Sequence, residues 1–433
     1  MIQGRRGGVA VMLVTGLLVV TMTGWLGAQV APAASVAAAA SVKRPKGEAL
    51  RVVSPVWMSP TLKGKALASA AVWRGANGQA LVITTAKLGN ALVVIDGVSG
   101  KMVRSVGTEG LKLGQLGRPN GVAVWGDVAI VVERENQRLH AFLLPSFKPL
   151  GFYADTLLIK PVGLAVRPRT ATTADLWVTD NQDLSPYPEE HAAVFRRRVK
   201  QFALTRTATG LTVGFVRAFG DTLKGGLLRS VESIGVDPNA EEVLIADEQV
   251  RDLNVYTTAG VFVSDFGQKH FHGQPEGLAL VSCGTGDGYW IATDQSNKRN
   301  QFHLFERGSY QYLASFGVAG VAKTNGIAVL PGTVGAMNGA LYVLNHDDNV
   351  AAVSLAAVWA AIGKAEPCAG GAANAAPKVA TPAPGAPPAT KAAPAAAAAP
   401  VKPTAKKPER RSLRQRHTTA DSPPPVTRSN LRS

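Results

Sequence analysis

Cysteine is almost absent from this chain, which has two, Cys283 and Cys368, among 433 residues. Two thiols cannot build a disulfide scaffold, and their spacing fits no metal motif. They form either one structural disulfide, which an oxidising compartment would allow, or two unpaired small buried side chains. The sequence leaves both interpretations open, and neither assigns a redox chemistry.

Signatures of several enzyme classes are also missing. The sequence contains no GxSxG, CxxC, HExxH or P-loop motif. Histidine is sparse, with seven scattered residues. His270 and His272 could hold a metal if they shared one face of a strand, but such a pair more often belongs to a polar loop. Serine-hydrolase, zinc-protease and nucleotide-binding chemistry are therefore not predicted.

Long apolar runs are confined to the N-terminus. Arg5 and Arg6 precede an apolar stretch from Val9 to Leu26, and small residues follow as far as Ala40. This pattern is typical of a secretory signal, so we expect residues 1–40 to direct export to the periplasm or the medium. An uncleaved membrane anchor is the less favoured interpretation.

Large apolar residues are scarce again at the C-terminal end. Residues 366–433 are rich in Ala and Pro and carry a basic cluster, "KKPERRSLRQR", at 406–416. Such a composition predicts a disordered tail that could contact an acidic envelope or membrane surface. Because this tail holds most of the net charge of +16, the charge does not predict a nucleic-acid partner.

What the chain does contain is a repeat between residues 41 and 365. A motif with the pattern xGhAh, where h is apolar, recurs at intervals suited to four short strands per unit. It reads RPNGVAV from Arg118, KPVGLAV from Lys160, SVESIGV from Ser230, QPEGLAL from Gln274 and KTNGIAV from Lys323. Each copy precedes a second apolar strand, a polar turn and a third strand, and a degenerate copy with "ASAAVW" comes earlier.

Six four-stranded units predict an all-β fold, a six-bladed β-propeller, for residues 41–365. We expect a long insertion near 183–198 and one helix over 353–364, and we expect a monomer. The motif strand should lie innermost, because Gly and Ala tolerate crowding near the axis. Residues just before it and just after the second strand would then surround one end of that axis.

Charged residues gather at these positions. Glu232, Glu276 and Asn325 precede motif strands, and Asp180, Asp247 and Asp294 end second strands in three units. Each aspartate taken alone could simply cap a turn. Several carboxylates around one opening must be protonated, paired or neutralised by a cation, and hard oxygen ligands suit Ca²⁺.

Cations stand at comparable positions. Lys87 and Arg134 follow second strands, and Lys298 and Arg299 lie in the turn after Asp294. Lysine and arginine bind phosphate oxygens. Carboxylates for a metal beside cations for phosphate predict a phosphate-ester site.

The chain resembles the β-propeller (alkaline) phytases. The likeness is carried by "QPEGLAL", "GYWIATDQSNKRNQFHLFERG" and "TNGIAVL", and by "VESIGVDPNAEEVLIADEQ" and "ITTAKLGNALVVID". The resemblance implies a phosphomonoester hydrolase acting on phytate or a similar phosphorylated small molecule, with bound Ca²⁺ activating water.

Site roles follow from the same resemblance. Glu232 and Glu276 match glutamates of the family, and we expect them to be catalytic. Lys87 and Arg134 match phosphate-binding residues of the family, and we expect Lys298 and Arg299 to bind phosphate as well. The expected metal ligands are Glu232, Glu276, Asp247, Glu248, Asp294 and Asn325.

Two departures from that family stand out. Its DDPA[IV]W motif is "ASAAVW" here, and its TDGIDV motif is "TNGIAV", with Asn325 and Ala328 in place of acids. Fewer anionic ligands predict weaker calcium binding and weakened activity. The sequence also resembles NHL-type propellers, most of which bind partners without catalysis, so the alternative is a scaffold for a protein, glycan or envelope partner.

Overall fold

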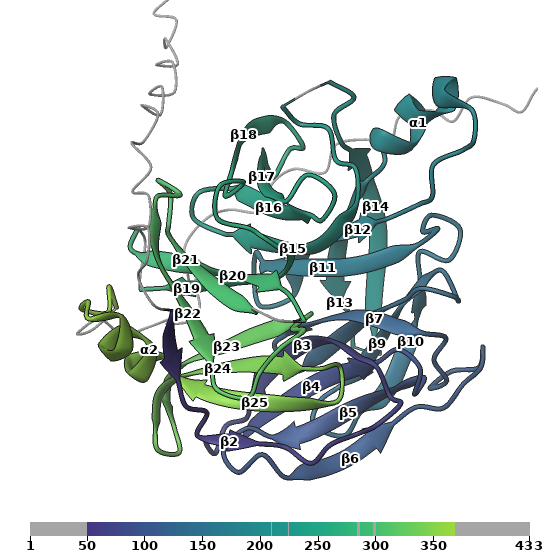
Figure 1. The fold of residues 1–433 in the computed structure, drawn as a ribbon. Coiled ribbons are helices and arrows are strands. Elements are labelled where there is room, and N and C mark those ends of the chain that lie inside the picture. Colours follow the sequence, from purple (N-terminus) through teal and green to yellow (C-terminus); the bar gives the residue numbers. More distant parts are fainter. Residues whose placement is uncertain (1–49, 209, 224, 284–285, 298–299, 369–433) are drawn as a thin grey trace, which may run out of the picture. The chain divides into compact units, whose positions relative to one another are not determined.

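The computed structural model describes residues 50–368 except positions 209, 224, 284–285 and 298–299. These residues form six sheets arranged around a common centre (Figure 1). The innermost strands contact one another in the order β3, β7, β11, β15, β19 and β23, and β23 contacts β3. The predicted six-bladed β-propeller is therefore confirmed, with the motif strands innermost.

The first half of the ring contains three blades, each ordered from the inside outwards. Blade 1 has β3 (Leu67–Arg74), β4 (Ala80–Ala86), β5 (Ala91–Asp96) and β6 (Met102–Val106). Blade 2 has β7 (Pro119–Trp125), β8 (Val128–Glu133), β9 (Arg138–Leu143) and β10 (Lys148–Tyr153). Blade 3 has β11 (Pro161–Pro168), β12 (Thr173–Asp180), β13 (Val199–Arg206) and β14 (Leu211–Phe219).

The second half uses strands from the N-terminal segment as well. Blade 4 has β15 (Val231–Asp237), β16 (Glu242–Asp247), β17 (Asp252–Thr257) and β18 (Phe262–Phe266). Blade 5 has β19 (Gln274–Ser282), β20 (Gly288–Gln295), β21 (Gln301–Glu306) and β22 (Tyr312–Val318), and β1 (Arg51–Val53) joins β22 in parallel. Blade 6 has β23 (Ile327–Val334), β24 (Met337–Asn345) and β25 (Asn349–Ser354), with β2 (Trp57–Met58) as its outer strand.

The burial of each strand follows from its place in the blade. Second strands such as β4 and β8 are buried along their whole length, because neighbouring blades pack against both faces. Their sequences are accordingly apolar runs rather than alternating ones. The outer strand β6 is mostly exposed, including its apolar residues Met102 and Val103. The cores lie between the blades, as the cluster that joins blades 1 and 2 through Ile83, Val94, Val131 and Phe142 illustrates.

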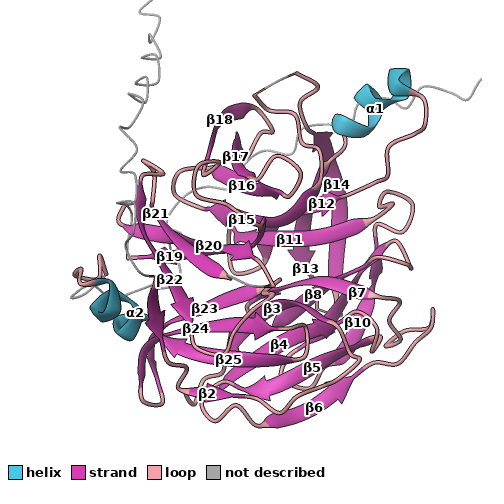
Figure 2. Ribbon diagram, viewed as in Figure 1, coloured by secondary structure: helices cyan, strands magenta, loops and turns pink. Residues whose placement is uncertain are grey.

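Helices are short and peripheral (Figure 2). The insertion in blade 3 carries a 3₁₀ turn, η1 (Pro188–Glu190), and α1 (His191–Phe195). The C-terminal helix α2 (Leu355–Ile362) begins two residues later than predicted, because Val353 still pairs with Leu341 in the sheet. It ends at Gly363, whose φ of 69° places this C-terminal capping residue in the left-handed conformation that glycine adopts readily.

The two ends of the described chain are fastened to neighbouring blades. Strand β2 completes blade 6, and α2 packs against β24 and β1. Cys368 forms a disulfide with Cys283 in blade 5, so of the two interpretations of the cysteines the paired one holds. No helix in the described part of the chain is long and apolar enough to cross a membrane. The expected signal segment 1–40 lies outside the described residues, as do residues 369–433 of the expected tail.

Glycine is required where the inner strands approach the axis. A Cβ atom on Gly121 would lie 2.5 Å from the carbonyl oxygen of Val162, and one on Gly163 would lie 2.6 Å from that of Glu232. A Cβ on Gly277 would lie 2.8 Å from the carbonyl oxygen of Asn325. These contacts are too short for any side chain, so glycine in the repeat sets the separation of adjacent blades.

Candidate functional site

Two positions in every blade face the same end of the axis. One is the residue before the motif glycine or serine, near the start of the inner strand. The other is the residue after the second strand or at its end. In blade 4 they are Glu232 and Glu248, and in blade 5 they are Glu276 and Gln295. All inner strands begin at this end, so both kinds of position gather there.

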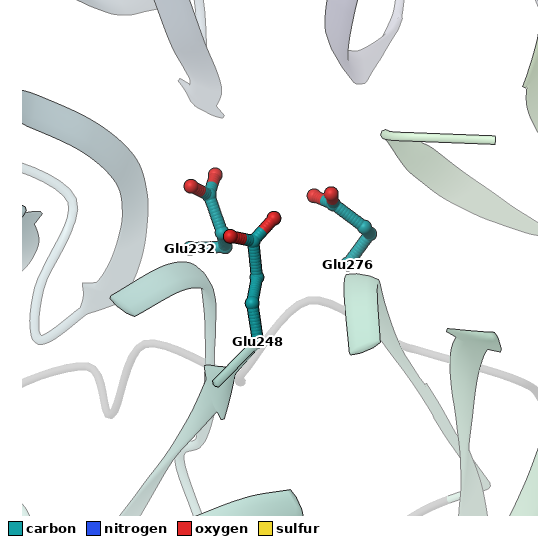
Figure 3. A group of neighbouring side chains, drawn as sticks. All are labelled: Glu232, Glu248 and Glu276. Atoms are coloured by element: carbon teal, nitrogen blue, oxygen red, sulfur yellow. The ribbon is translucent and has the colours of Figure 1, made fainter. Parts of the chain in front are cut away.

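Three glutamates meet at this end (Figure 3). Glu232 comes from β15, Glu248 follows β16 and Glu276 comes from β19. Carboxylate oxygens from all three lie within 4.8 Å of one another. Side chains so placed could act together on one ligand. The sequence predicted all three for this site, and the structure brings them together.

The proximity of these carboxyl groups changes their acidity. Burial and the charge of Glu248 raise the pKa of Glu232 to about 8, against the opposing effect of Lys87 and Arg134. Burial, the charge of Glu232 and a hydrogen bond with Glu248 raise the pKa of Glu276 well above its usual range. Glu232 and Glu276 therefore favour their protonated forms at neutral pH unless a cation takes the place of the protons.

Two cations act on the cluster from other blades. Lys87 follows β4 in blade 1, and Arg134 follows β8 in blade 2. Both lower the pKa of Glu232, and Lys87 also lowers that of Glu276. This end of the axis is thus polarised, with cations on blades 1 and 2 and carboxylates on blades 4 and 5. The other predicted phosphate-binding residues, Lys298 and Arg299, lie outside the described residues.

Three carboxylates at these distances fit a divalent cation. Oxygen ligands suit Ca²⁺ or Mg²⁺, and a bound cation would remove the mutual repulsion that now raises the pKa of Glu232 and Glu276. Within the described ranges, these glutamates are the group whose ligand atoms come together in this way.

Asp247 and Asp294, predicted as metal ligands, lie elsewhere. The Asp247 carboxylate accepts hydrogen bonds from the backbone N–H groups of Arg229 (2.5 Å) and Ser230 (3.2 Å). Asp294 accepts from the N–H groups of His272 (3.1 Å) and Gly273 (2.6 Å). Both side chains are fully buried. Their oxygens are occupied by the loops that lead into the strands bearing Glu232 and Glu276.

We call this arrangement a clasp: a side chain at the end of a second strand accepts hydrogen bonds from the loop before the inner strand. It recurs around the ring. Asp180 accepts from the N–H groups of Ile159 and Lys160, Glu133 from that of Gly117, and Asn345 from that of Ala322. In blades 2 to 6 the acceptor ends the second strand and fixes the loop entering the inner strand, whereas the second strand of blade 1 ends at Ala86. The recurrence of acids at this position therefore reflects turn capping, the simpler of the two interpretations.

Nearby polar groups compensate the buried charge of these clasps. Lys200 pairs with Asp180, and Arg138 and His140 contact Glu133. For Asp294, burial would raise the pKa, but hydrogen bonding and the charge of His303, with the two backbone N–H groups, bring it below its usual range.

Asn325 stands at the blade 6 position but is held by its neighbours. Its side chain accepts a hydrogen bond from Gln295 and donates one to Asp347 at 2.8 Å. Asp347, which sequence analysis missed, also pairs with Lys323 at 2.8 Å. The signal for it was present, since Asp347 lies just beyond the end of β24. Asn325 is not in the three-glutamate group.

The histidine pair belongs to a loop, the more common setting. His270 stacks on Tyr312 with ring centroids 4.0 Å apart. The His272 side chain is 78% exposed, with Nδ1 3.8 Å from an Asp294 carboxylate oxygen. The two rings therefore do not share a strand face.

The known proteins compared with this chain are at most distantly similar to it. No family model matches the sequence, and no curated protein matches it. Among solved structures, catalytically inactive virginiamycin B lyase from Staphylococcus aureus with quinupristin is 11% identical, with a TM-score of 0.42, over 68% of this chain and 98% of that one. Hydrazine synthase from Kuenenia stuttgartiensis is 10% identical, with a TM-score of 0.42, over 71% of this chain and 82% of that one.

Proposed function

We propose that this chain is a cation-dependent phosphomonoester hydrolase whose site is the three-glutamate group. The observation that carries the proposal is the meeting of Glu232, Glu248 and Glu276 within 4.8 Å, opposite Lys87 and Arg134. Ca²⁺ is the first candidate cation, and phytate or a simpler phosphomonoester is the candidate substrate.

The residues divide the work as follows. The three glutamates would hold the cation, which would supply charge neutralisation and a more acidic water. Lys87 and Arg134 hold the phosphate oxygens and offset their charge. With a cation held there, Glu232 and Glu276 would be deprotonated, and either could accept the proton of the attacking water. A P–O bond forms to that water, the ester P–O bond breaks, and the proton that the glutamate accepted passes to the leaving alkoxide, which departs as the alcohol.

The expected export of the chain belongs to the same proposal. Calcium is abundant outside the cytoplasm, and the Cys283–Cys368 disulfide suits an oxidising compartment.

One assay tests the proposal. Phosphate release from phytate and from p-nitrophenyl phosphate is measured with Ca²⁺ and with a chelator, and calcium binding is measured by calorimetry. We expect calcium-dependent release that falls at least about 100-fold in the E232Q/E276Q variant, as is usual when charged catalytic groups are removed.

The matched control is E189Q/E190Q, which removes two carboxylates from the exposed insertion of blade 3. This variant should bind calcium and release phosphate like the parent. No release with any divalent cation would reject the hydrolase. Calcium binding without release would favour the non-catalytic scaffold. The neutral residues Ala68 in blade 1 and Asn325 in blade 6, at the positions that hold Glu232 and Glu276 in blades 4 and 5, also favour that alternative.

A further inference from the structure

Exposed leucines mark the end of the propeller that carries the glutamates. Leu111 is 70% exposed, Leu113 53% and Leu223 71%. They lie in the connections between β6 and β7 and between β14 and β15, each of which leads from an outer strand to the next inner strand. Connections of this kind, and Glu232 near the start of β15, lie at the same end of the axis.

The two leucine loops share one construction. Each is closed at its base by an isolated parallel bridge, Glu109 with Leu116 in the first and Asp221 with Leu227 in the second. Each turns through a backbone hydrogen bond between residues three apart, from Gln115 N–H to Lys112 in the first loop and from Gly226 N–H to Leu223 in the second. Because two loops at one end of the axis share this bridged construction and both expose leucine, we treat the exposed leucines as one recurring feature.

Buried side chains fix the backbone of both loops. Arg138, which is 6% exposed, donates from its guanidinium to the carbonyl oxygen of Leu111 at 2.9 Å. Tyr256, which is 1% exposed, donates its hydroxyl to the carbonyl oxygen of Gly226. The leucines are therefore held out by an anchored backbone.

Further apolar side chains lie at the same end on blade 3, between the two loops. Leu184 is 40% exposed and Tyr187 59% exposed, in the insertion between β12 and β13. Turns at the opposite end of the axis offer Val98 and Val261 among the described exposed large apolar residues. Leu88 in the β4–β5 turn of blade 1 is 61% exposed at the glutamate end as well, so the large exposed apolar side chains of the loops at this end extend over blades 1 to 4.

The chemistry beside the leucines selects an occupant. Lys112 is exposed between Leu111 and Leu113, and Arg229 is exposed at the end of the connection that carries Leu223. An exposed leucine with a cation in the same loop suits an interface where acyl chains lie below anionic headgroups, because the apolar side chain can enter and the cationic group can stay in the headgroup layer.

We propose that this end of the propeller, through Leu111, Leu113 and Leu223, docks onto the surface of an anionic lipid bilayer. The docking places the glutamate end towards the headgroups. Docking requires neither hydrolysis nor a bound cation, so the docking proposal is tested independently of the proposed phosphatase activity.

Vesicle binding tests the docking. The chain purified after export is sedimented with vesicles of phosphatidylcholine and phosphatidylglycerol in equal amounts, at low and at high salt. We expect the L111S/L113S/L223S variant to partition about tenfold or more weakly than the parent at high salt, where purely Coulombic binding by the basic tail is screened. The V98S/V261S variant, altered at the opposite end, should bind like the parent.

A second readout covers the case in which the triple variant is unstable. Tryptophan introduced by L223W should be quenched by brominated lipids, whereas V261W should not be. Equal partition of the parent and the triple variant, equal loss in V98S/V261S, no parent binding at high salt, or an unquenched L223W would each overturn the proposal.

Discussion

Glu232 gives the cluster a measurable pH dependence. Its pKa is raised to about 8 in the folded protein, against an ordinary value of 4.5. A carboxyl group of this kind favours folding fully below its unfolded pKa, and that contribution is lost as the pH rises through the folded pKa. Without a cation, stability should therefore fall between about pH 4.5 and about pH 8.

The E232Q variant should show a smaller fall over this window and melt about 2 °C or more above the parent at pH 8 without calcium, because repulsion within the cluster is relieved. Calcium should reverse the order, since it stabilises the parent and binds the variant weakly. Thermal melting of both proteins across this pH range, with calcium and with a chelator, measures the effect. Parallel melting curves for parent and variant would show that Glu232 has an ordinary pKa.

Single residues were predictable here only when their position and chemistry agreed. Glu232, Glu248 and Glu276 stand where the repeat places site residues, and the structure brings them together. Asp247 and Asp294 stand next to such positions and carry the same charge. What separates them is the N–H groups of Arg229 and Gly273, among others, which occupy their oxygens. The sequence does not show which N–H groups a folded loop presents.

At the scale of strands, glycine sets the contact between blades. A Cβ atom at Gly163 in β11 would lie 2.6 Å from the carbonyl oxygen of Glu232 and 3.2 Å from the Cα atom of Ser233, both in β15. Backbone cannot yield as a flexible side chain can. We therefore expect Gly163→Ala to lower the free energy of unfolding by about 1–3 kcal/mol, as overpacking does elsewhere.

Gly214→Ala is the matched control, because a Cβ atom there meets nothing within 4 Å and the residue also lies in a strand, β14. Denaturant unfolding of the two variants should separate them clearly. Equal midpoints would mean that blades 3 and 4 can move apart without cost.

Elements of the repeat were easier to predict than those outside it. The motif, the apolar second strand and the alternating third strand each have a period that sequence alone reveals. Strands β1 and β2 are three and two residues long and depend on partners far along the chain, β22 and β25. Nothing in "RVV" or "WM" indicates those partners, so both strands were missed.

At the scale of the whole molecule, the disulfide ties the C-terminal segment to blade 5. Cys283 and Cys368 are 85 residues apart, so the bond shortens the unfolded chain considerably. A C283S/C368S variant should lose about 2–4 kcal/mol of unfolding free energy, and its thermal midpoint should fall. Reduction of the parent should lower its midpoint similarly and leave that of the variant unchanged. If the variant melts like the oxidised parent, the bond contributes nothing to stability.

The paired positions facing the axis, one near the start of each inner strand and one at or after the end of each second strand, make the ring a scaffold with interchangeable contents. Buried clasps such as Asp180 and Asp247 hold the backbone without help from the side chains at those positions. Ala68 in blade 1 and Val162 in blade 3 occupy the same positions that hold glutamates in blades 4 and 5. Exchanging residues among these places would move the negative pole around the axis while the fold stays the same, which makes the propeller a starting point for designing binding sites of chosen polarity.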